Sequence, residues 1–343
     1  MMPKFRRSLH FLVADLLYYS GVLACWQFLR RRVWSANETC VLCLHRVLKE
    51  EDRNRSGSLD GMILKEATFV AMLEYLKKKF CFISLQEFIN RRSANTGQSK
   101  LLCFLTFDDG WKDNFTTAFP WLKKLQLPAV IFLVTGLVDT SETFWVERLN
   151  WAWRDADSRQ RILSRLKTSW EVHNKQPEFS EIVELLKQMS AGERQEILAP
   201  LGGTENQRVL GGDVDRMLTW EEVITMSRDG IEFGAHSVTH PLLTFENAAR
   251  VEEELAVGKQ VIKEKLGKSV RAFAYPNGSW NDRVRRSAEQ AGYDCAFTTQ
   301  RGWHSPTDDP YTIRRIMLHE GVVTGRSGKF SPAMLSLRLS GWF

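Results

Sequence analysis

The chain has 343 residues, of which 43% are hydrophobic and 26% are charged, which is the composition of an ordinary folded protein and excludes a disordered one. Its length allows one large domain with an insertion, or two domains. The formal net charge is +6, but residues 1–36 carry +5 of it, and the nearly neutral remainder argues against a nucleic-acid-binding body, which would spread basic residues over the fold.

The first predicted element is an apolar helix over residues 9–29, with basic residues on both sides. It is long enough to span a bilayer, but polar residues, among them Asp15, interrupt it, and a charge inside lipid is costly. We therefore favour a helix that lies on a membrane surface, with its arginines among anionic headgroups. A helix packed on the fold is the second alternative and a spanning helix the third. A cleaved signal peptide fits poorly, because Arg30, Arg31 and Arg32 follow the apolar run.

Short apolar runs bounded by turn residues predict seven buried strands, at 40–47, 101–107, 129–135, 231–237, 271–276, 295–299 and 312–318. Helical patterns lie between most of them, for example at 66–79, 114–126, 248–267 and 282–292. Strands that are apolar on both faces and alternate with helices predict a parallel sheet covered by helices. Seven such units predict an α/β fold built as a closed or nearly closed β/α barrel.

The regular spacing breaks between the third and fourth strands, where the sequence is helical, charged and rich in tryptophan. We expect a helical insertion there, which is either a lid that faces the substrate or a peripheral bundle without a catalytic role. The predicted organisation is an N-terminal helix, two barrel segments separated by the insertion, and a C-terminal tail, at 1–36, 37–139, 140–217, 218–328 and 329–343.

The six cysteines form no recognisable framework. Cys40 and Cys43 have C-x-x-C spacing, but no second pair completes a zinc site of that type. We interpret all six as small buried hydrophobic residues in a reducing compartment.

Polar residues gather where the predicted strands end, and the carboxyl ends of the strands carry catalysis in β/α barrels. Asp108 and Asp109 end the second strand, His236 and His240 end the fourth, and His319 ends the seventh. Two imidazoles and one carboxylate suit Zn²⁺ or a similar divalent ion. A metal would also explain the adjacent aspartates, because one carboxylate can bind it while the other takes a proton from the attacking water.

Three motifs carry a family resemblance: TFDDG at 106–110, HSVTH at 236–240 and RAFAYPNG at 271–278. In this order they resemble the signature motifs of the NodB-homology polysaccharide deacetylases, carbohydrate esterase family four. CLHRV at 43–47 resembles the strand that opens many members. The resemblance implies a distorted seven-stranded β/α barrel, here with a helical insertion and an N-terminal apolar helix, in agreement with the strand count.

The resemblance also implies a role for the residues that match these motifs. Asp109, His236 and His240 would bind a divalent metal, Zn²⁺ in the first place, with Co²⁺ or Ni²⁺ as alternatives. Asp108 would be the general base, and Arg271 would pair with it and tune its pKa.

Further roles concern the oxyanion and the leaving group. The backbone N–H of Tyr275 would stabilise the oxyanion together with the metal. His319, in IMLH, would be the general acid; the motif that usually orients this acid is not obvious, and Asp308 or Asp309 could substitute for it. Outside the motifs, His45 is either a structural residue or a pocket residue. Trp280 and Trp303 are either sugar platforms or packing residues.

The expected activity is therefore the metal-dependent removal of an N-acetyl group from an amino sugar of a cell-envelope polysaccharide or lipid-linked glycan. The alternatives are an amidohydrolase of the same fold that acts on a small non-sugar amide, and a catalytically silent carbohydrate-binding barrel. The N-terminal segment predicts a membrane surface as partner, no nucleic acid is expected, and the location is predicted as the inner face of the membrane on the cytoplasmic side. A periplasmic or secreted location is the alternative.

Overall fold

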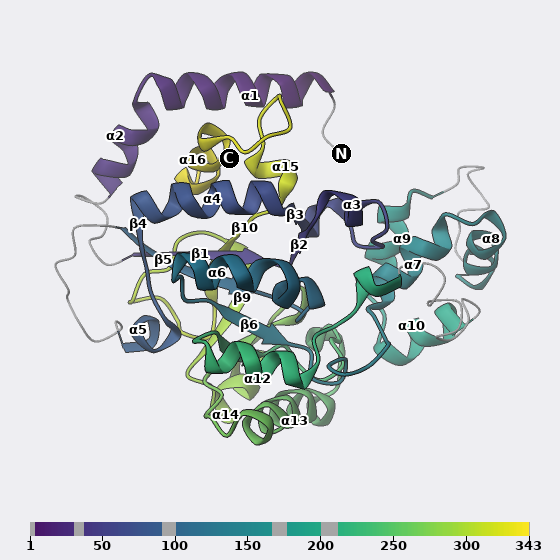
Figure 1. The fold of residues 1–343 in the computed structure, drawn as a ribbon. Helices are drawn as coiled ribbons and strands as arrows, with labels where there is room; N and C mark the ends of the chain where they lie inside the picture. The colour runs from purple at the N-terminus through teal and green to yellow at the C-terminus, as the bar shows by residue number, and fades with distance from the viewer. Residues whose placement is uncertain (1–3, 31–37, 91–100, 167–176, 200–211, 343) are drawn as a thin grey trace.

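The fold is taken from a computed structural model, which describes residues 4–30, 38–90, 101–166, 177–199 and 212–342. A barrel of parallel strands occupies its centre, with helices around it (Figure 1). The strands of the barrel are β1 Thr39–Leu44, β5 Leu101–Phe107, β6 Val130–Leu133, β7 Glu232–Ala235, β8 Ala272–Ala274, β9 Cys295–Arg301 and β10 Ile313–Met317.

The seven predicted strands are all present, and they close into a barrel. Parallel pairing runs in chain order from β5 to β10, and β1 closes the ring by pairing with both β10 and β5. β4 (Phe80–Phe82) pairs with the amino end of β5, and β2 (Arg46–Leu48) and β3 (Ile63–Lys65) form a separate parallel pair. The predicted seven-stranded β/α barrel is therefore confirmed.

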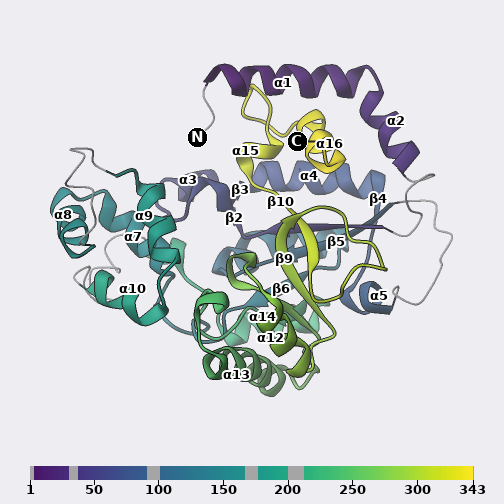
Figure 2. The ribbon, with the colours of Figure 1, turned by 180° about the vertical axis from the view of Figure 1, so that it is seen from behind.

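The strands are apolar on both faces because each face is buried against a different layer. Inward side chains such as Phe104, Phe132 and Phe297 fill the barrel, and outward ones such as Leu42 and Leu105 pack under the surrounding helices. Figure 2 shows the same layers from behind. The covering helices include α4 Glu66–Lys79, α5 Leu85–Asn90, α6 Phe119–Leu125, α12 Trp220–Arg228, α13 Ala248–Leu266 and α14 Asp282–Gln290.

The two ends of the chain meet on one flank of the barrel. The helices α1 (Lys4–Tyr19) and α2 (Val22–Leu29) lie over α16 (Pro332–Ser340), at the top of Figure 1. Phe11 and Leu23 are buried against Met334 and Leu337 of α16. The N-terminal segment is thus packed on the fold along one side.

The other side of α1 and α2 is apolar and exposed, with Leu9 at 54%, Leu12 at 48% and Leu16 at 64% exposure. No single helix in the described part of the chain is long and apolar enough to cross a membrane. The pair Ser8–Tyr19 and Val22–Leu29, bent by 67°, passes that test together by length and composition. Arg31 and Arg32, which the membrane prediction also uses, lie outside the described residues.

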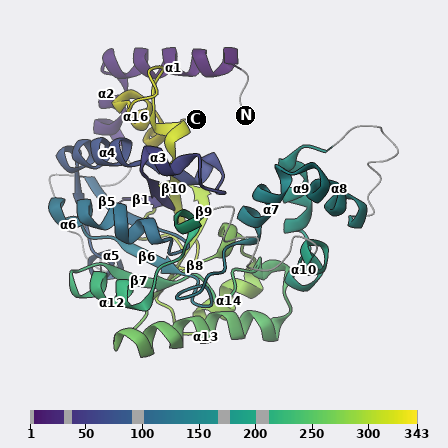
Figure 3. The ribbon, with the colours of Figure 1, turned by 45° about the vertical axis from the view of Figure 1, so that its right-hand side comes forward.

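The segment between β6 and β7 forms a group of short helices beside the carboxyl end of the barrel (Figure 3). These helices have their own apolar core, which includes Leu149, Ile162, Ile182 and Leu186. Their bounds are α7 Trp145–Trp153, α8 Ala156–Arg165, α9 Phe179–Lys187 and α10 Ala191–Leu198. The helical insertion of the predicted fold is therefore present.

Candidate active site

The two adjacent aspartates follow β5 at the carboxyl end of the barrel. On an extended chain their side chains would point to opposite faces. Asp109, however, has a φ of 79° and Gly110 has a φ of 79°, so the chain enters the left-handed region directly after Asp108. Aspartate tolerates this region better than most residues, and glycine adopts it without steric cost. The turn brings both carboxylates to one group of histidines.

Asp109, His236 and His240 come together, as the strand ends and the family resemblance predicted. The Oδ1 atom of Asp109 lies 3.6 Å from Nε2 of His236 and 3.6 Å from Nε2 of His240. Nδ1 of His236 lies 2.7 Å from the carbonyl oxygen of Ala274, so it carries the proton of the neutral ring and leaves the Nε2 lone pair facing the group. Zinc ligands about 2 Å from a tetrahedral ion are separated by similar distances.

The electrostatics of these three side chains also suit a cation. Burial lowers the pKa of His236, and burial together with His236 lowers that of His240, so both rings are neutral donors. Burial and the charge of Asp108 raise the pKa of Asp109 well above its usual range. A divalent ion would offset both effects on Asp109, so the donor set fits a Zn²⁺-type ion.

The Asp108 carboxylate is held by Arg315, a residue inside β10. Two nitrogens of the guanidinium donate to the two carboxylate oxygens, each at 2.7 Å, and the side chains of Arg315 and Asp108 are 0% and 2% exposed. Burial alone would raise the pKa of Asp108, but the guanidinium outweighs burial and holds that pKa well below its usual range. Asp108 is therefore ionised, as a general base must be.

The prediction that Arg271 pairs with Asp108 is wrong. Arg271 precedes β8 and so lies at the amino end of the barrel, where it pairs with Asp294 and donates to Oε1 of Gln86 at 2.6 Å. Asp108 lies at the carboxyl end. The sequence did hold a signal for the correct residue: alternate residues of β10 face the interior, and an inward arginine in an apolar strand needs an acidic partner.

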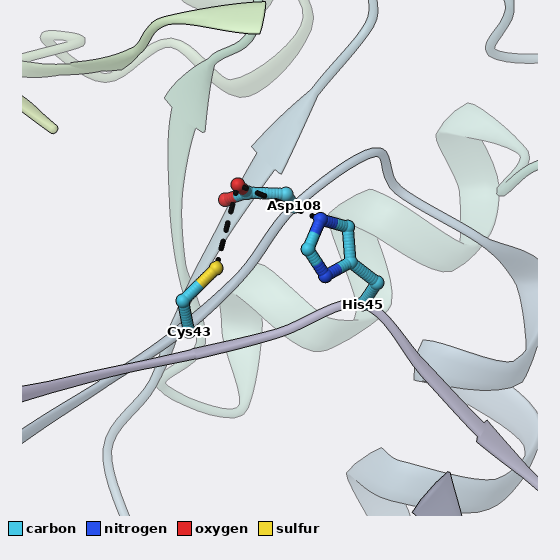
Figure 4. A group of neighbouring side chains, drawn as sticks. All are labelled: Cys43, His45 and Asp108. Atoms are coloured by element: carbon cyan, nitrogen blue, oxygen red, sulfur yellow. Dashed lines mark hydrogen bonds and ion pairs between the residues drawn. The ribbon is translucent and has the colours of Figure 1, made fainter. Parts of the chain in front are cut away.

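Cys43 and His45 of the first strand segment point toward Asp108 (Figure 4). Sγ of Cys43 lies 3.6 Å, and Nε2 of His45 3.9 Å, from Oδ2 of Asp108. The three side chains are close enough to be a second metal-binding group. We assign them instead to the surroundings of the base, because Arg315 already occupies both oxygens and burial raises the pKa of the Cys43 thiol, which stays neutral. Burial also lowers the pKa of His45 to about 4.

The amide of Tyr275 does not serve as an oxyanion donor in this structure. It donates to the carbonyl oxygen of Phe297, at 3.0 Å, in the pairing of β8 with β9. Pro276 has no N–H, and the Gly278 amide donates to the Tyr275 carbonyl at 2.7 Å. Within this turn of the described chain, Asn277, with a φ of 56°, has the backbone N–H that no hydrogen bond uses.

His319 lies between β10 and α15 (Glu320–Val323), and burial lowers its pKa. The negative charge of Asp60 opposes this effect and raises the pKa of His319. The two predicted partners are engaged elsewhere: Asp309 accepts from Arg285 at 2.7 and 3.1 Å, and Asp308 accepts from a backbone amide of its own turn at 3.1 Å. The prediction that Asp308 or Asp309 orients His319 is therefore wrong.

The residues that hold Asp109 in place were not found from the sequence. Nε1 of Trp111 donates to Oδ2 of Asp109 at 3.0 Å, which leaves Oδ1 toward the histidines. The guanidinium of Arg46, a fully buried side chain, lies 4.1 Å from the centre of the Trp111 ring. Arg46 pairs with Asp113 at 2.9 Å and with Asp215. A buried arginine in the apolar run after His45 was the available signal.

The insertion contacts the site. The Phe144 ring packs against the ring of His240, with 4.9 Å between the ring centres. Glu147 of α7 is buried and accepts from the Ser58 hydroxyl at 3.1 Å. Burial, with the charge of Asp215, raises the pKa of Glu147 to about 7. These contacts favour an insertion that faces the site over a purely peripheral bundle.

Two smaller predictions also need correction. Trp303 is no sugar platform: its ring is buried, it donates to the Leu339 carbonyl at 2.9 Å, and Arg30 covers it at 4.5 Å. Cys25 is exposed and Cys81 is half-buried, so the expectation of six buried cysteines holds for the other four. None of the six forms a disulfide within the part of the chain that the structure describes.

The barrel therefore carries two aspartates and two histidines together at its carboxyl end, in a group that could hold a metal ion. Residues 95–296 match the model of the polysaccharide deacetylase family. The match spans more than half of the chain, so the chain belongs to the polysaccharide deacetylase family, a family of hydrolases, and the resemblance seen in the motifs is confirmed.

Individual relatives are distant. The YxkH protein of Bacillus subtilis is 25% identical over 117 residues, 34% of this chain but only 42% of that protein. The poly-beta-1,6-N-acetyl-D-glucosamine N-deacetylase of Staphylococcus epidermidis is 21% identical over 294 residues, 83% of this chain and 80% of that protein. The structure of IcaB from Ammonifex degensii superposes with a TM-score of 0.56 and 20% identity, covering 88% of this chain and 96% of that one, which supports the fold.

Proposed function

We propose that the protein is a metal-dependent N-deacetylase that removes the acetyl group from an amino sugar of a cell-envelope polysaccharide or a lipid-linked glycan. The observation that carries this proposal is that the two neighbouring carboxylates, Asp108 and Asp109, have different partners. Asp108 is held ionised by Arg315, and Asp109 faces two neutral imidazoles. A staphylococcal relative named as an N-acetyl-D-glucosamine polymer deacetylase supports the substrate class.

Asp109, His236 and His240 would hold the ion, with Zn²⁺ favoured and Co²⁺ or Ni²⁺ as alternatives. When bound, such an ion supplies positive charge that polarises the amide carbonyl and lowers the pKa of water. Asp108 takes the proton of the attacking water, and its pairing with Arg315 keeps it ionised for that step.

The negative charge that develops on the carbonyl oxygen needs a hydrogen-bond donor. We assign the backbone N–H of Asn277 to this role, because it belongs to the YPNG turn and is without a partner among the described residues. His319 donates a proton to the leaving amine. Since burial lowers its pKa, His319 must take up that proton within the catalytic cycle, and Asp108, protonated after the first step, can supply it.

The test of this function is acetate release from an N-acetylglucosamine oligomer by the Zn²⁺-loaded protein, compared with release from a small non-sugar N-acetyl amide. Acetate from the oligomer, at least a hundredfold less from Asp108→Asn, supports the proposal. Release of acetate only from the small amide favours the alternative, an amidohydrolase of the same fold that acts on non-sugar amides. Binding of the oligomer with no acetate from any substrate favours the silent barrel. Mass spectrometry of envelope glycans with and without active protein would then identify the natural substrate.

We also propose that the protein lies on the inner face of a membrane, through the outer side of α1 and α2. Exposed leucines on that side and the +5 charge of residues 1–36 support it. Leu9→Glu with Leu16→Glu should move the protein from the membrane fraction to the soluble one, and these residues leave the side packed on α16 intact. Val257→Glu, at a residue of α13 that is 42% exposed, is the control and is compared with Leu16→Glu alone, which adds the same charge.

The location of the protein is tested by a separate experiment. Protease added to intact spheroplasts should leave the barrel uncut if it lies on the inner face. Cleavage there would contradict the inner-face proposal and favour a periplasmic or secreted enzyme, while leaving the activity proposal as it stands.

A further inference from the structure

A cavity of about 460 Å³ lies on the flank of the barrel, away from the metal ligands. Arg314 and Ile316 of β10 form part of its wall, whereas Arg315 between them points inward to Asp108. The sheet therefore separates this cavity from the active site. The other walls come from α2, from the chain after β9 and from the C-terminal residues. Its lining includes three tryptophans and three arginines: Trp26, Trp303, Trp342, Arg30, Arg301 and Arg314. We call it the arginine–tryptophan pocket.

The three arginines of this pocket outnumber its two acidic side chains, Glu38 and Asp308. Arg30 has an acidic partner, because its Nε donates to Glu38 at 2.9 Å. Arg301 donates to the Arg338 carbonyl at 2.7 Å, and its buried Nε has no hydrogen-bond partner. Among the described residues, Arg314 forms no ion pair and is exposed to the pocket side. Two guanidinium groups are thus left with unused donors at one cavity.

A neighbouring arginine increases the excess of positive charge. Arg338 donates only to the Met317 carbonyl, at 3.2 and 3.4 Å, within the described part of the chain. Burial and the charge of Arg301 lower the pKa of Arg338 to about 10, and burial lowers that of Arg301. Burial and both of these charges lower the pKa of His10 on α1. Groups that repel one another in this way are stabilised by a bound anion.

The aromatic side chains show what kind of anion would suit the pocket. Trp26 and Trp342 pack with their ring centres 5.1 Å apart, and Trp342 is 38% exposed. The helix α2 that supplies Trp26 also exposes Phe28 and Leu29, at 55% and 43%. Tryptophan and arginine beside exposed apolar side chains are the combination found at the headgroup level of membranes.

We propose that the arginine–tryptophan pocket binds an anionic phosphoryl group, with Arg301 and Arg314 as its principal donors. Guanidinium groups match phosphate oxygens in geometry and keep their charge at any physiological pH. The phosphoryl group can come from an anionic lipid headgroup, in which case the pocket fixes α2 on the membrane, or from free phosphate. The site is independent of the proposed deacetylation, because no residue of the pocket belongs to the active site.

The experiment uses the full chain and two probes. Inorganic phosphate is titrated by calorimetry, and sedimentation is measured with vesicles of phosphatidylglycerol and of phosphatidylcholine. Arg301→Gln with Arg314→Gln should weaken binding by roughly tenfold for each arginine removed. Arg53→Gln with Arg55→Gln is the matched control, because it removes the same charge from α3 (Glu50–Arg53) and just after it, where the side chains are 28% and 60% exposed.

Loss of phosphate binding in the pocket variant alone would support the proposal with free phosphate as a source. Loss of the preference for phosphatidylglycerol vesicles in that variant alone would support it with the lipid headgroup as the source. Absence of binding to either probe in the wild type, or equal losses in the pocket and control variants, would overturn it. If Arg301→Gln does not fold, Arg314→Gln, at an exposed residue, decides the same question. Neither probe depends on turnover, so failure of the deacetylase proposal would leave this result unaffected.

Discussion

Replacing Arg315 should impair turnover far more than replacing Arg271. Arg315→Gln removes a guanidinium that donates to both oxygens of Asp108 at 2.7 Å, and both side chains are buried. Breaking a buried pair of this kind costs about 3–5 kcal/mol, because the remaining charge stays buried without its partner. Part of this cost should appear as a protonated base. We therefore expect a fall in kcat/KM of about a hundredfold to a few thousandfold.

Arg271→Gln is the control, since it removes the arginine of the same motif that the sequence predicted to pair with the base. Its guanidinium is 29% exposed at the other end of the barrel, and an ion pair of that kind contributes about 0–1 kcal/mol. Acetate release by the two Zn²⁺-loaded variants, with their thermal unfolding, distinguishes the two arginines. Equal loss in both variants, or wild-type turnover in Arg315→Gln, would refute the assignment of Arg315 to the base.

Three further predictions concern neighbouring residues. Asp108→Asn should keep its metal and lose turnover roughly a hundredfold or more, whereas Asp109→Asn should lose the metal first; equal metal content by elemental analysis would contradict this division. Trp111→Phe removes the N–H that holds Asp109 at 3.0 Å and should lower metal affinity about tenfold to a hundredfold in a chelator competition. Burial raises the pKa of Glu147 from 4.5 to about 7, so the contribution of Glu147 to the stability of the metal-free protein should be fully present below pH 4.5 and be lost as the pH rises through 7. At about 1.4 kcal/mol per pH unit this loss is roughly 3 kcal/mol, and Glu147→Gln should abolish it in denaturant unfolding at pH 5 and pH 8.

The barrel could be predicted from sequence because its strands are apolar on both faces and because they alternate with helices. A run such as LLCFLTF is apolar at six of its seven positions, on both faces of the strand, which only a strand buried on both faces requires. The metal ligands could be predicted as well, because carboxyl ends of parallel strands meet at one end of the barrel whatever the exact pairing. Strand order was enough to bring the two aspartates and the two histidines together, and the family resemblance was needed to distinguish Asp109 as the ligand.

Contacts that depend on how far along its strand a residue lies could not be predicted from the sequence in the same way. Arg271 and Arg315 both fall in predicted strands, but in the structure Arg271 precedes β8 whereas Arg315 lies within β10, so only Arg315 reaches the carboxyl end. The oxyanion donor depends on similar detail. Whether the amide of Tyr275 or that of Asn277 is available is decided by the pairing with β9, which takes up the first of them.

The insertion contributes to the metal site because it supplies part of the negative charge that the buried Arg46 needs. Asp109 can present one oxygen to a metal only if the other is held, and Trp111 holds it. The position of Trp111 is fixed by Arg46, which covers its ring. A fully buried guanidinium requires buried negative charge, and Asp215, from the segment that closes the insertion, supplies it together with Asp113. The apolar core of the insertion includes Leu149 of α7, and Trp151 of the same helix donates to Asp215 at 3.3 Å. Loss of the Asp215 carboxylate would leave Arg46 with one of its two acidic partners, next to the tryptophan that orients the metal ligand.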